Sequence, residues 1–421
     1  MSELETVTIE KLVFGGQGLA TLADGRKVFV WNALPGERAA IRLIKQKRSY
    51  AEAIAEEVLE PAAERQAPLE PNYLATSPWQ MMSYEAENRY KTQLLDELFA
   101  HEKIALPAHA AIIAPDDAWH YRNKMEYSFW GDDDGLHLAL HRRGSHGKEI
   151  VQGSVLALPA VDAAANSIVT ALNGLGLRAG DLKTLVVRCD QAGKAVAALF
   201  TKVAKDFPRL ELDAAVAGLR VYYSEPKSPA SVPTRLLYEA GDCQLSDQLL
   251  GQAFAYDVDS FFQVNVPLFE RVLGEIREHA GQGHITDMYA GVGTIGLSVA
   301  AERVELVELD QASAAMARHN AASSKLQATV IEASTEKALD YITGEGTVIF
   351  DPPRAGLHPK VIDRVLEVKP AQLIYLSCNP ATQARDLARL QVAYIIDHFA
   401  SYNFFPRTPH IESLAVLRLK D

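Results

Sequence analysis

The stretch Asp287-Met288-Tyr289-Ala290-Gly291-Val292-Gly293-Thr294-Ile295-Gly296 decides the fold of the C-terminal half of the chain. It follows a strand predicted over residues 283–288 and leads into a helix predicted over residues 295–301. Glycines at these positions let the backbone turn sharply and approach a ligand, and the N-terminus of the following helix carries a partial positive charge. The stretch therefore predicts a strand–loop–helix unit with a ligand at the loop.

Strand and helix patterns alternate on both sides of this loop. A helix is predicted upstream over residues 266–279, and a strand (304–309) and a helix (312–323) follow downstream. Further strands are predicted over residues 328–331, 347–350 and 373–376. This alternation predicts a doubly wound α/β domain of the Rossmann-like kind, which we place at residues 256–421.

Acidic side chains stand where two of these strands end, and ligands bind at the carboxyl ends of such strands. Glu308 ends the second strand and can hold both hydroxyls of a ribose. Asp351 ends the fourth, before a rigid shelf of two prolines. A dinucleotide would fit the same pattern. Asp287, however, suits the cationic, zwitterionic methionine end of S-adenosylmethionine better than a diphosphate, so we expect S-adenosylmethionine as the cofactor.

Cys378 stands at the end of the next strand, in Ser377-Cys378-Asn379-Pro380. The other cysteines, Cys189 and Cys243, are far away in sequence and form no CxxC pair, so the spacing predicts neither a disulfide framework nor a metal site. A cysteine is more often a small buried hydrophobe than a catalyst. The place of Cys378, on the same sheet edge as Gly291, Glu308 and Asp351, makes it a candidate nucleophile.

Methylation of carbon 5 of uracil needs such a thiolate, because that carbon is a poor nucleophile. Addition of the thiolate to carbon 6 makes an enolate, whose carbon 5 attacks the sulfonium methyl group. A base must then remove the carbon 5 proton so that the cysteine can leave. The C-terminal segment offers Glu412 and His410 as candidate bases.

The first sixty residues show short strand patterns separated by turn signals such as Asp24-Gly25 and Pro35-Gly36. This spacing predicts a small barrel like those that bind oligonucleotides. The formal net charge of −12 argues against a nucleic-acid partner. Residues 38–50 nevertheless hold five basic and no acidic residues, and residues 141–148 form a second basic cluster. We place the barrel at residues 1–60.

Residues 61–255 are expected to form a central β-rich α+β domain that binds RNA. Its first part, residues 61–78, reads as a linker rich in proline and alanine, and a helix is predicted over residues 86–99. Strand-like patterns dominate from about residue 120 to residue 250. The aromatic and basic stretch Trp119 to Trp130 belongs to this domain.

Five ordered motifs resemble those of the RNA 5-methyluridine methyltransferases. They are Ser260-Phe261-Phe262-Gln263-Val264-Asn265, the stretch 287–296, Asp351-Pro352-Pro353-Arg354, the stretch 377–380, and Phe405-Pro406-Arg407-Thr408-Pro409-His410-Ile411-Glu412. Residues 14–20 resemble the start of a TRAM domain, a small RNA-binding barrel, and Tyr121-Arg122-Asn123-Lys124 fits the family too. The resemblance spans nearly the whole chain and implies a class I methyltransferase domain in its C-terminal part.

The resemblance also implies roles for single residues. Cys378 would be the nucleophile and Glu412 the base that removes the proton. Phe261 and Asp351 would contact a uracil flipped out of its stack, and the cofactor contacts would be Gln263, Tyr289, Thr294, Glu308 and Asp351. Arg122 and Lys124 would hold RNA phosphate. In the family, residues 83–115 pack on the catalytic domain, which we expect here as well.

The chain departs from the family at two places. Many members hold an iron–sulfur cluster through four cysteines, but the similar stretch 65–80 contains none, and Ser154 stands where the fourth would be. We therefore expect no cluster and no metal, with packing to hold that segment instead. Ser334 stands where the family often has an acidic or amide residue, which leaves its contact with the adenine open.

The expected target is 23S ribosomal RNA, because the TRAM-like barrel accompanies those members, with transfer RNA as the alternative. An amino-methylating RNA or DNA enzyme would share Asp351-Pro352-Pro353, but Arg354, Cys378 and Glu412 oppose it. A non-catalytic RNA-binding protein would share the barrel but has no need of the cysteine–glutamate pair. The acidic start lacks a signal peptide and no apolar stretch is long enough to span a bilayer, so we expect a cytoplasmic protein without a membrane partner. The sequence leaves the oligomeric state open, and a monomer is assumed.

Overall fold

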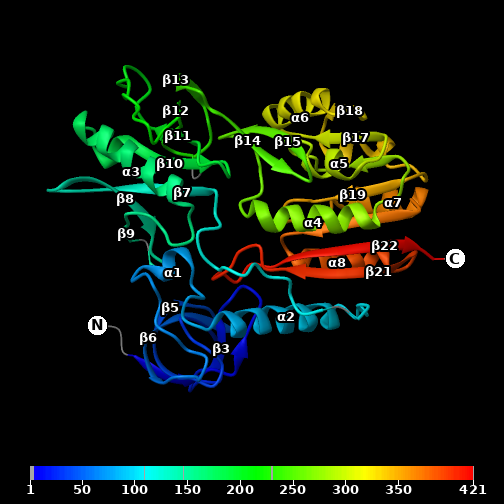
Figure 1. Ribbon diagram of the computed structural model, residues 1–421. Helices are drawn as coiled ribbons and strands as arrows, with labels where there is room; N and C mark the ends of the chain where they lie inside the picture. The colour runs from blue at the N-terminus through cyan, green and yellow to red at the C-terminus, as the bar shows by residue number, and fades with distance from the viewer. Residues whose placement is uncertain (1–3, 109, 146, 229–230, 421) are drawn as a thin grey trace.

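The computed structural model describes residues 4–108, 110–145, 147–228 and 231–420. Residues 1–3 of the acidic start and His146 of the second basic cluster lie outside the described residues. In Figure 1 the N-terminal barrel (blue) and the central sheet (cyan to green) lie beside the C-terminal domain (yellow to red). No described helix has both the length and the apolar character needed to cross a bilayer.

The N-terminal strands form one six-stranded sheet in the order β1-β5-β6-β4-β3-β2. β1 also contacts β3, so the sheet curls into the small barrel that the sequence predicts, around an apolar core that includes Val28, Ile41 and Ala53. The strands are β1 (Glu5–Thr8), β2 (Lys11–Leu12), β3 (Gly18–Thr21), β4 (Lys27–Trp31), β5 (Arg38–Gln46) and β6 (Tyr50–Glu60).

The linker between barrel and central sheet contains the short helix α1 (Tyr73–Thr76) and leads into α2 (Tyr84–His101). Both hydrogen bonds and packing hold this cysteine-free segment. The buried Gln80 side chain donates to Glu70 at 2.9 Å and to Ser77 at 2.5 Å, and it accepts from the Leu69 amide at 2.9 Å. The Trp79 side chain beside it is fully buried.

Helix α2 leaves the barrel and runs along the C-terminal domain (Figure 1). Its apolar residues Leu95 and Phe99 share a core with the C-terminal sheet. The ring of Phe99 meets Phe399 edge-on, with ring centroids 5.1 Å apart. Ser83 caps the helix by accepting from the Ala86 amide, as expected of a serine at that position.

The central sheet has seven strands in the order β13-β12-β11-β10-β7-β8-β9, with α3 (Pro159–Gly174) packed against β8, β10 and β11. A hairpin of β14 and β15 follows and contacts α6 (Gln311–Ser323) of the C-terminal domain, where Asn320 bonds both the amide and the carbonyl of Ala255. The strands are β7 (Lys124–Asp132), β8 (Gly135–His141), β9 (Lys148–Ile150), β10 (Leu182–Cys189), β11 (Ala195–Thr201), β12 (Gly218–Tyr223), β13 (Arg235–Gly241), β14 (Gln244–Leu249) and β15 (Gln252–Asp257).

The C-terminal sheet confirms the predicted doubly wound fold. Its order is β18-β17-β16-β19-β20-β22-β21, with the first five strands parallel and β22 antiparallel to both of its neighbours. The strands are β16 (Ile285–Asp287), β17 (Arg303–Glu308), β18 (Gln327–Glu332), β19 (Thr347–Phe350), β20 (Gln372–Ser377), β21 (Tyr394–Tyr402) and β22 (Glu412–Leu419).

Helices cover both faces of this sheet, and each face has an apolar core of its own. The core of one face includes Phe269 of α4 and Ile295 of α5, and that of the other includes Val361 of α7 and Leu387 of α8. The helices are α4 (Val266–His279), α5 (Thr294–Val299), α6 (Gln311–Ser323), α7 (Pro359–Val368) and α8 (Pro380–Leu390). The strand order reverses between β16 and β19, which is where such sheets bind ligands.

Candidate active site

A cavity of about 1150 Å³ opens at the carboxyl ends of β16, β17, β19 and β20. Gly291, Glu308, Asp351 and Cys378 all line it, so the four strand ends converge on one site, as the sequence predicts. Apolar side chains such as Ile295 also line the cavity, and a few polar groups lie among them. A mostly apolar cleft with few placed polar groups is typical of a small-molecule site.

The glycine-rich loop at the end of β16 needs its glycines. Gly293 has φ +87°, and a Cβ atom there would lie 2.9 Å from Leu297 Cδ1. A Cβ atom at Gly296 would lie 2.5 Å from Leu306 Cδ2. Side chains at these two positions would push the helix away from the sheet, so glycine keeps α5 close against β17.

Asp287 does not face the cavity, which corrects the expectation that it meets the methionine end of the cofactor. Its side chain is fully buried, and Oδ2 accepts from the Gly296 amide at 2.9 Å. Burial raises the pKa of this carboxyl to about 7. Asp287 therefore fastens the loop from behind, and sequence position alone did not reveal which way it points.

Glu308 lies at the cavity wall with its carboxylate held in place. Oε2 accepts from the Gly291 amide at 2.8 Å, and Oε1 accepts from the Asp310 amide at 2.7 Å. Each carboxylate oxygen has lone pairs beyond the one used here, so both can still accept from ribose hydroxyls. A fixed carboxylate that can accept from two hydroxyls fits the nucleoside end of S-adenosylmethionine.

The other predicted cofactor contacts also line the cavity. Gln263 and Thr294 are each 7% exposed, and Tyr289 is mostly buried, which raises the pKa of its phenol to about 12. Ser334 lines the same cavity, beside Glu336. The cavity thus brings together all five predicted cofactor residues.

Cys378 and Glu412 face each other where β20 and β22 meet. Ser377 pairs with Ser413 in the antiparallel ladder, so the next residues outward are Cys378 and Glu412. Cys378 lies just beyond the end of β20, and the Glu412 carboxyl is close enough to raise the pKa of its thiol. Cys378 is half-buried, whereas Glu412 is 2% exposed and its Oε2 has no hydrogen-bond partner among the described residues.

Burial, and after it the neighbouring carboxyls, favour the protonated forms of this pair. Burial raises the pKa of the Cys378 thiol to about 12, and the carboxyls of Glu412 and Asp351 raise it too. Burial and then Asp351 raise the pKa of Glu412 well above its ordinary value, and burial raises that of Asp351 to about 7. Arg354 lowers the pKa of both Cys378 and Glu412. The sequence shows Arg354 within a motif but does not reveal this electrostatic role.

His410 lines the same cavity, with its ring edge-on to Phe405 at a centroid distance of 5.6 Å. Burial and then the nearby cations, of which Arg354 is the strongest, lower its pKa to about 4. The ring is therefore neutral at physiological pH. Both candidate bases thus lie at the cavity, but only Glu412 lies directly opposite Cys378.

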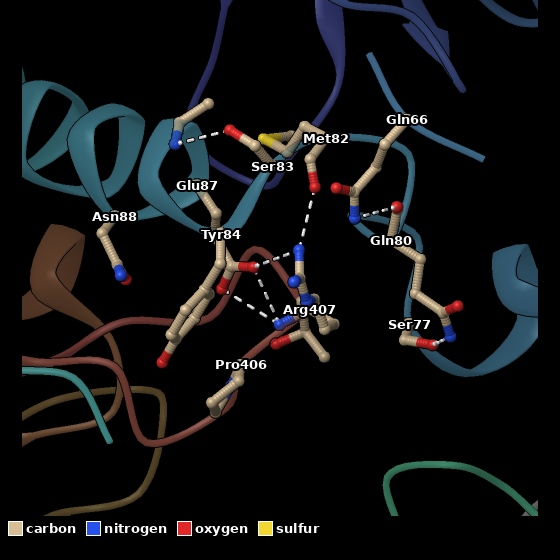
Figure 2. A network of polar contacts seen from close by, with 12 residues as sticks. Gln66, Ser77, Gln80, Met82, Ser83, Tyr84, Glu87, Asn88, Pro406 and Arg407 are labelled. Atoms are coloured by element: carbon tan, nitrogen blue, oxygen red, sulfur yellow. Dashed lines mark hydrogen bonds and ion pairs between the residues drawn. The ribbon is translucent and has the colours of Figure 1, made fainter. Parts of the chain in front are cut away.

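The loop that precedes Glu412 is tied to other parts of the chain (Figure 2). The buried carboxylate of Glu87 accepts from the Arg407 amide at 3.0 Å and lies 3.0 Å from the Lys91 ammonium. The Arg407 guanidinium donates to the Met82 carbonyl at 2.8 Å and stacks between the rings of Tyr84 and Trp119. No local pattern in the sequence indicates this network, because Glu87 and Arg407 are 320 positions apart.

The predicted RNA contacts lie in three different settings. Phe261 is 64% exposed and lines the cavity. The Arg122 guanidinium lies over the Phe405 ring, 5.9 Å from its centroid. Lys124 is partly buried, and burial followed by the charge of Arg188 lowers its pKa to about 8. Neither Arg122 nor Lys124 lines the cavity itself.

Ion pairs neutralise part of the two basic clusters. On β5, Arg38, Arg42 and Lys45 pair with glutamates of β6 at 2.6–2.9 Å. In the second cluster Arg142 pairs with Glu149, and Arg143 stacks on Trp31 at 4.1 Å from the ring centroid. Arg143 therefore joins the central sheet to the barrel. The sequence showed the cations but not their partners on the neighbouring strands.

Known proteins resemble the chain along its whole length. Residues 244–420 match the model of the tRNA (Uracil-5-)-methyltransferase family, and residues 3–55 match that of the TRAM domain. An uncharacterized RNA methyltransferase of Nitratidesulfovibrio vulgaris is 30% identical, with 99% of this chain and 96% of the relative covered. One from Thermotoga maritima is 29% identical, with 98% and 99% covered.

A solved structure supports the fold. The Pyrococcus abyssi tRNA (uracil-54, C5)-methyltransferase, in complex with S-adenosyl-L-homocysteine, superposes with a TM-score of 0.78 at 23% identity. The match covers 97% of this chain and 99% of that one. The chain therefore belongs to the RNA (uracil-5-)-methyltransferase family and is a TRAM-containing RNA methyltransferase.

Proposed function

We propose that this enzyme methylates carbon 5 of a uridine in RNA through a covalent bond between Cys378 and carbon 6 of the uracil. The observation that carries the proposal is the position of Cys378 opposite Glu412, with Asp351 nearby, on the cavity that Glu308 also lines. Nucleophile, base and cofactor contacts thus share one site. S-adenosylmethionine supplies the electrophilic methyl group there.

The residues can perform the reaction in balanced steps. The Cys378 thiol gives its proton to the Asp351 carboxylate, which returns it when the thiolate is released at the end, so Glu412 stays free to act as a base. The thiolate adds to carbon 6, so that the electron pair of the 5,6 double bond moves toward oxygen 4. Carbon 5 takes the methyl group as the sulfonium becomes a thioether. Glu412 then removes the carbon 5 proton, the double bond re-forms, and Cys378 leaves as a thiolate.

The local charges suit these steps. A carboxylate whose pKa is raised by burial is a stronger base than a solvated one, which favours removal of a proton from carbon. Arg354 lies at the same cavity and lowers the pKa of the thiol. Its positive charge also stabilises the negative charge that builds up on the uracil. Phe261, exposed at the cavity, can pack beside the flipped base.

Two classes of RNA are candidates for the target. The barrel favours 23S ribosomal RNA, as argued from the sequence. Transfer RNA is the second candidate, because the family model carries that name and the Pyrococcus abyssi enzyme, which acts on uracil-54 of tRNA, matches this chain over 99% of its length. We therefore propose ribosomal RNA first and transfer RNA as its alternative, with Arg122 and Lys124 near the phosphates.

The test is transfer of radiolabelled methyl from S-adenosylmethionine to total RNA from cells that lack this gene. The labelled RNA is sized and its nucleosides are identified, with wild type, Cys378→Ala and Cys243→Ala side by side. Cys243 is a buried cysteine away from the cavity and controls for the substitution. We expect label in 5-methyluridine from wild type and Cys243→Ala alone. Label in an amino group, or equal label from Cys378→Ala, would exclude the covalent route.

A further inference from the structure

The C-terminal loop (residues 403–411) joins β21 to β22 and carries part of the active site. Phe405 and His410 of this loop line the cavity, and Glu412 follows it directly. The loop's own bonds centre on Thr408: its hydroxyl donates to the Phe405 carbonyl at 2.7 Å, its amide donates to the same carbonyl at 3.2 Å, and its Oγ1 accepts from the His410 amide at 3.4 Å. Its position is therefore set largely by the segments that surround it.

The N-terminal barrel is one of these segments. Gly16, in the turn between β2 and β3, lies against Pro409 and Trp79. A Cβ atom at Gly16 would lie 2.7 Å from Pro409 Cγ, closer still to Pro409 Cβ, and 3.1 Å from Trp79 Nε1. Because real Cβ atoms do not approach other atoms this closely, only glycine allows the loop to sit where it does.

Trp79 connects the same turn to the middle of the loop. Its Nε1 donates to the Gly16 carbonyl at 3.0 Å, and its backbone amide donates to the Arg407 carbonyl at 3.1 Å. Arg407 has φ +63°, an uncommon conformation for a residue other than glycine, and its amide donates to the buried Glu87. Figure 2 shows how Glu87 and the Met82 carbonyl hold Arg407 from the helix side.

We propose that Gly16 of the barrel helps to position Glu412, so that the barrel is part of the active-site support as well as a binding domain for RNA. Gly16, Trp79 and Arg407 form a continuous path from the barrel to the loop. The inference rests on the proposed function, because it takes Glu412 as the base. Gly16 and Trp79 are positioning residues, since neither lines the cavity.

The chain offers a matched pair of variants. Gly15 and Gly16 have nearly the same φ, +100° and +97°, but a Cβ atom at Gly15 would meet nothing within 4 Å. Gly15→Ala therefore places a side chain at a similar positive φ without the contacts to Pro409 and Trp79. A difference between the two variants reports on those contacts.

We expect Gly16→Ala to lower kcat for RNA methylation about 10- to 100-fold relative to Gly15→Ala, as displacement of a catalytic group by about 1 Å does. KM for RNA should stay within about twofold, because Gly16 and Trp79 are buried and present no surface of their own to RNA. Since Glu412 acts after methyl transfer, Gly16→Ala should also accumulate the covalent enzyme–RNA adduct during turnover. A defect of RNA binding alone would produce neither effect.

Trp79→Phe provides a second test in case Gly16→Ala unfolds. It removes the Nε1 donor and retains an aromatic ring, so kcat should fall severalfold with KM for RNA unchanged. If wild type is active, either of two results would overturn the inference: equal kcat values for Gly15→Ala and Gly16→Ala, or a change confined to KM for RNA. If wild type itself forms no 5-methyluridine, the proposed function fails instead, so the two failures can be told apart.

Discussion

Cys378 and Glu412 lie opposite each other one step beyond the Ser377–Ser413 pair, on strands that run in opposite directions. The antiparallel strand β22, inserted between β20 and β21, is what creates this relationship. In a purely parallel sheet, the strand after β20 would bring its own carboxyl end to this edge. Here the same edge receives the start of β22, and with it Glu412.

Glu308 should govern the affinity for S-adenosylmethionine. Glu308→Gln removes one charged acceptor from the ribose site, and a hydrogen bond to a charged group contributes about 1.5–3 kcal/mol. We expect Kd for S-adenosylmethionine to rise about 10- to 100-fold, measured by calorimetry without RNA. Glu332→Gln is the control. Glu332 is the strand partner of Glu308 in the β17–β18 ladder, but its carboxylate forms an ion pair with Arg318 and lies outside the cavity. Equal affinities for the two variants would remove the ribose assignment.

Activity should rise with pH across the neutral range. Burial raises the pKa of the Cys378 thiol to about 12, and it raises the pKa of the Glu412 carboxyl well above its ordinary value. A higher pH therefore increases the deprotonated fraction of both groups. Arg354 lowers both pKa values, and Arg354→Gln should therefore shift the rise in kcat/KM to higher pH, by up to about one unit. The pH–rate profile of the variant measures this shift.

Arg389→Gln is the control for that profile. Arg389 lines the same cavity but pairs with Asp363 at 2.7 Å, and it is not among the charges that shift the pKa of Cys378 or Glu412. Its profile should keep the wild-type midpoint. A shift of the same size in both variants would show that the effect comes from general loss of positive charge.

Glu87 should be one of the strongest single determinants of stability. Glu87→Gln leaves the buried Lys91 ammonium without its carboxylate partner, and removing one member of a buried ion pair costs about 3–5 kcal/mol. Glu85→Gln is the control, since Glu85 lies in the same first turn of α2 but is exposed. Urea unfolding of the two variants measures the difference. A free energy of unfolding that is equal for both would show that the network adds nothing to stability.

The C-terminal domain could be predicted in detail because its elements carry local signals. The helix of residues 266–279 and the strand of residues 347–350 have the predicted bounds, and Gly291, Glu308, Asp351 and Cys378 share one edge simply because parallel strands end together. The orientation of Asp287 could not be predicted, since a strand-end carboxylate can equally face the ligand or the loop behind it.

The connections between domains carry no such signal. Glu87 binds the Arg407 amide, Trp79 binds the Gly16 carbonyl, and Arg143 stacks on Trp31, all across long sequence separations. From its local sequence alone, each of these residues would be interpreted as a solvated charge or as an apolar core residue. Only the folded chain shows that they hold the loop before Glu412 and the barrel in place.

The most direct test of the covalent route uses Glu412→Gln, which cannot remove the carbon 5 proton. The variant is incubated with S-adenosylmethionine and its RNA, digested, and analysed by mass spectrometry, with Cys378→Ala treated in parallel. We predict a peptide that carries a methylated uridine nucleotide bonded to Cys378, and no adduct with Cys378→Ala. Absence of any adduct with Glu412→Gln, together with methyl transfer by Cys378→Ala, would contradict the account.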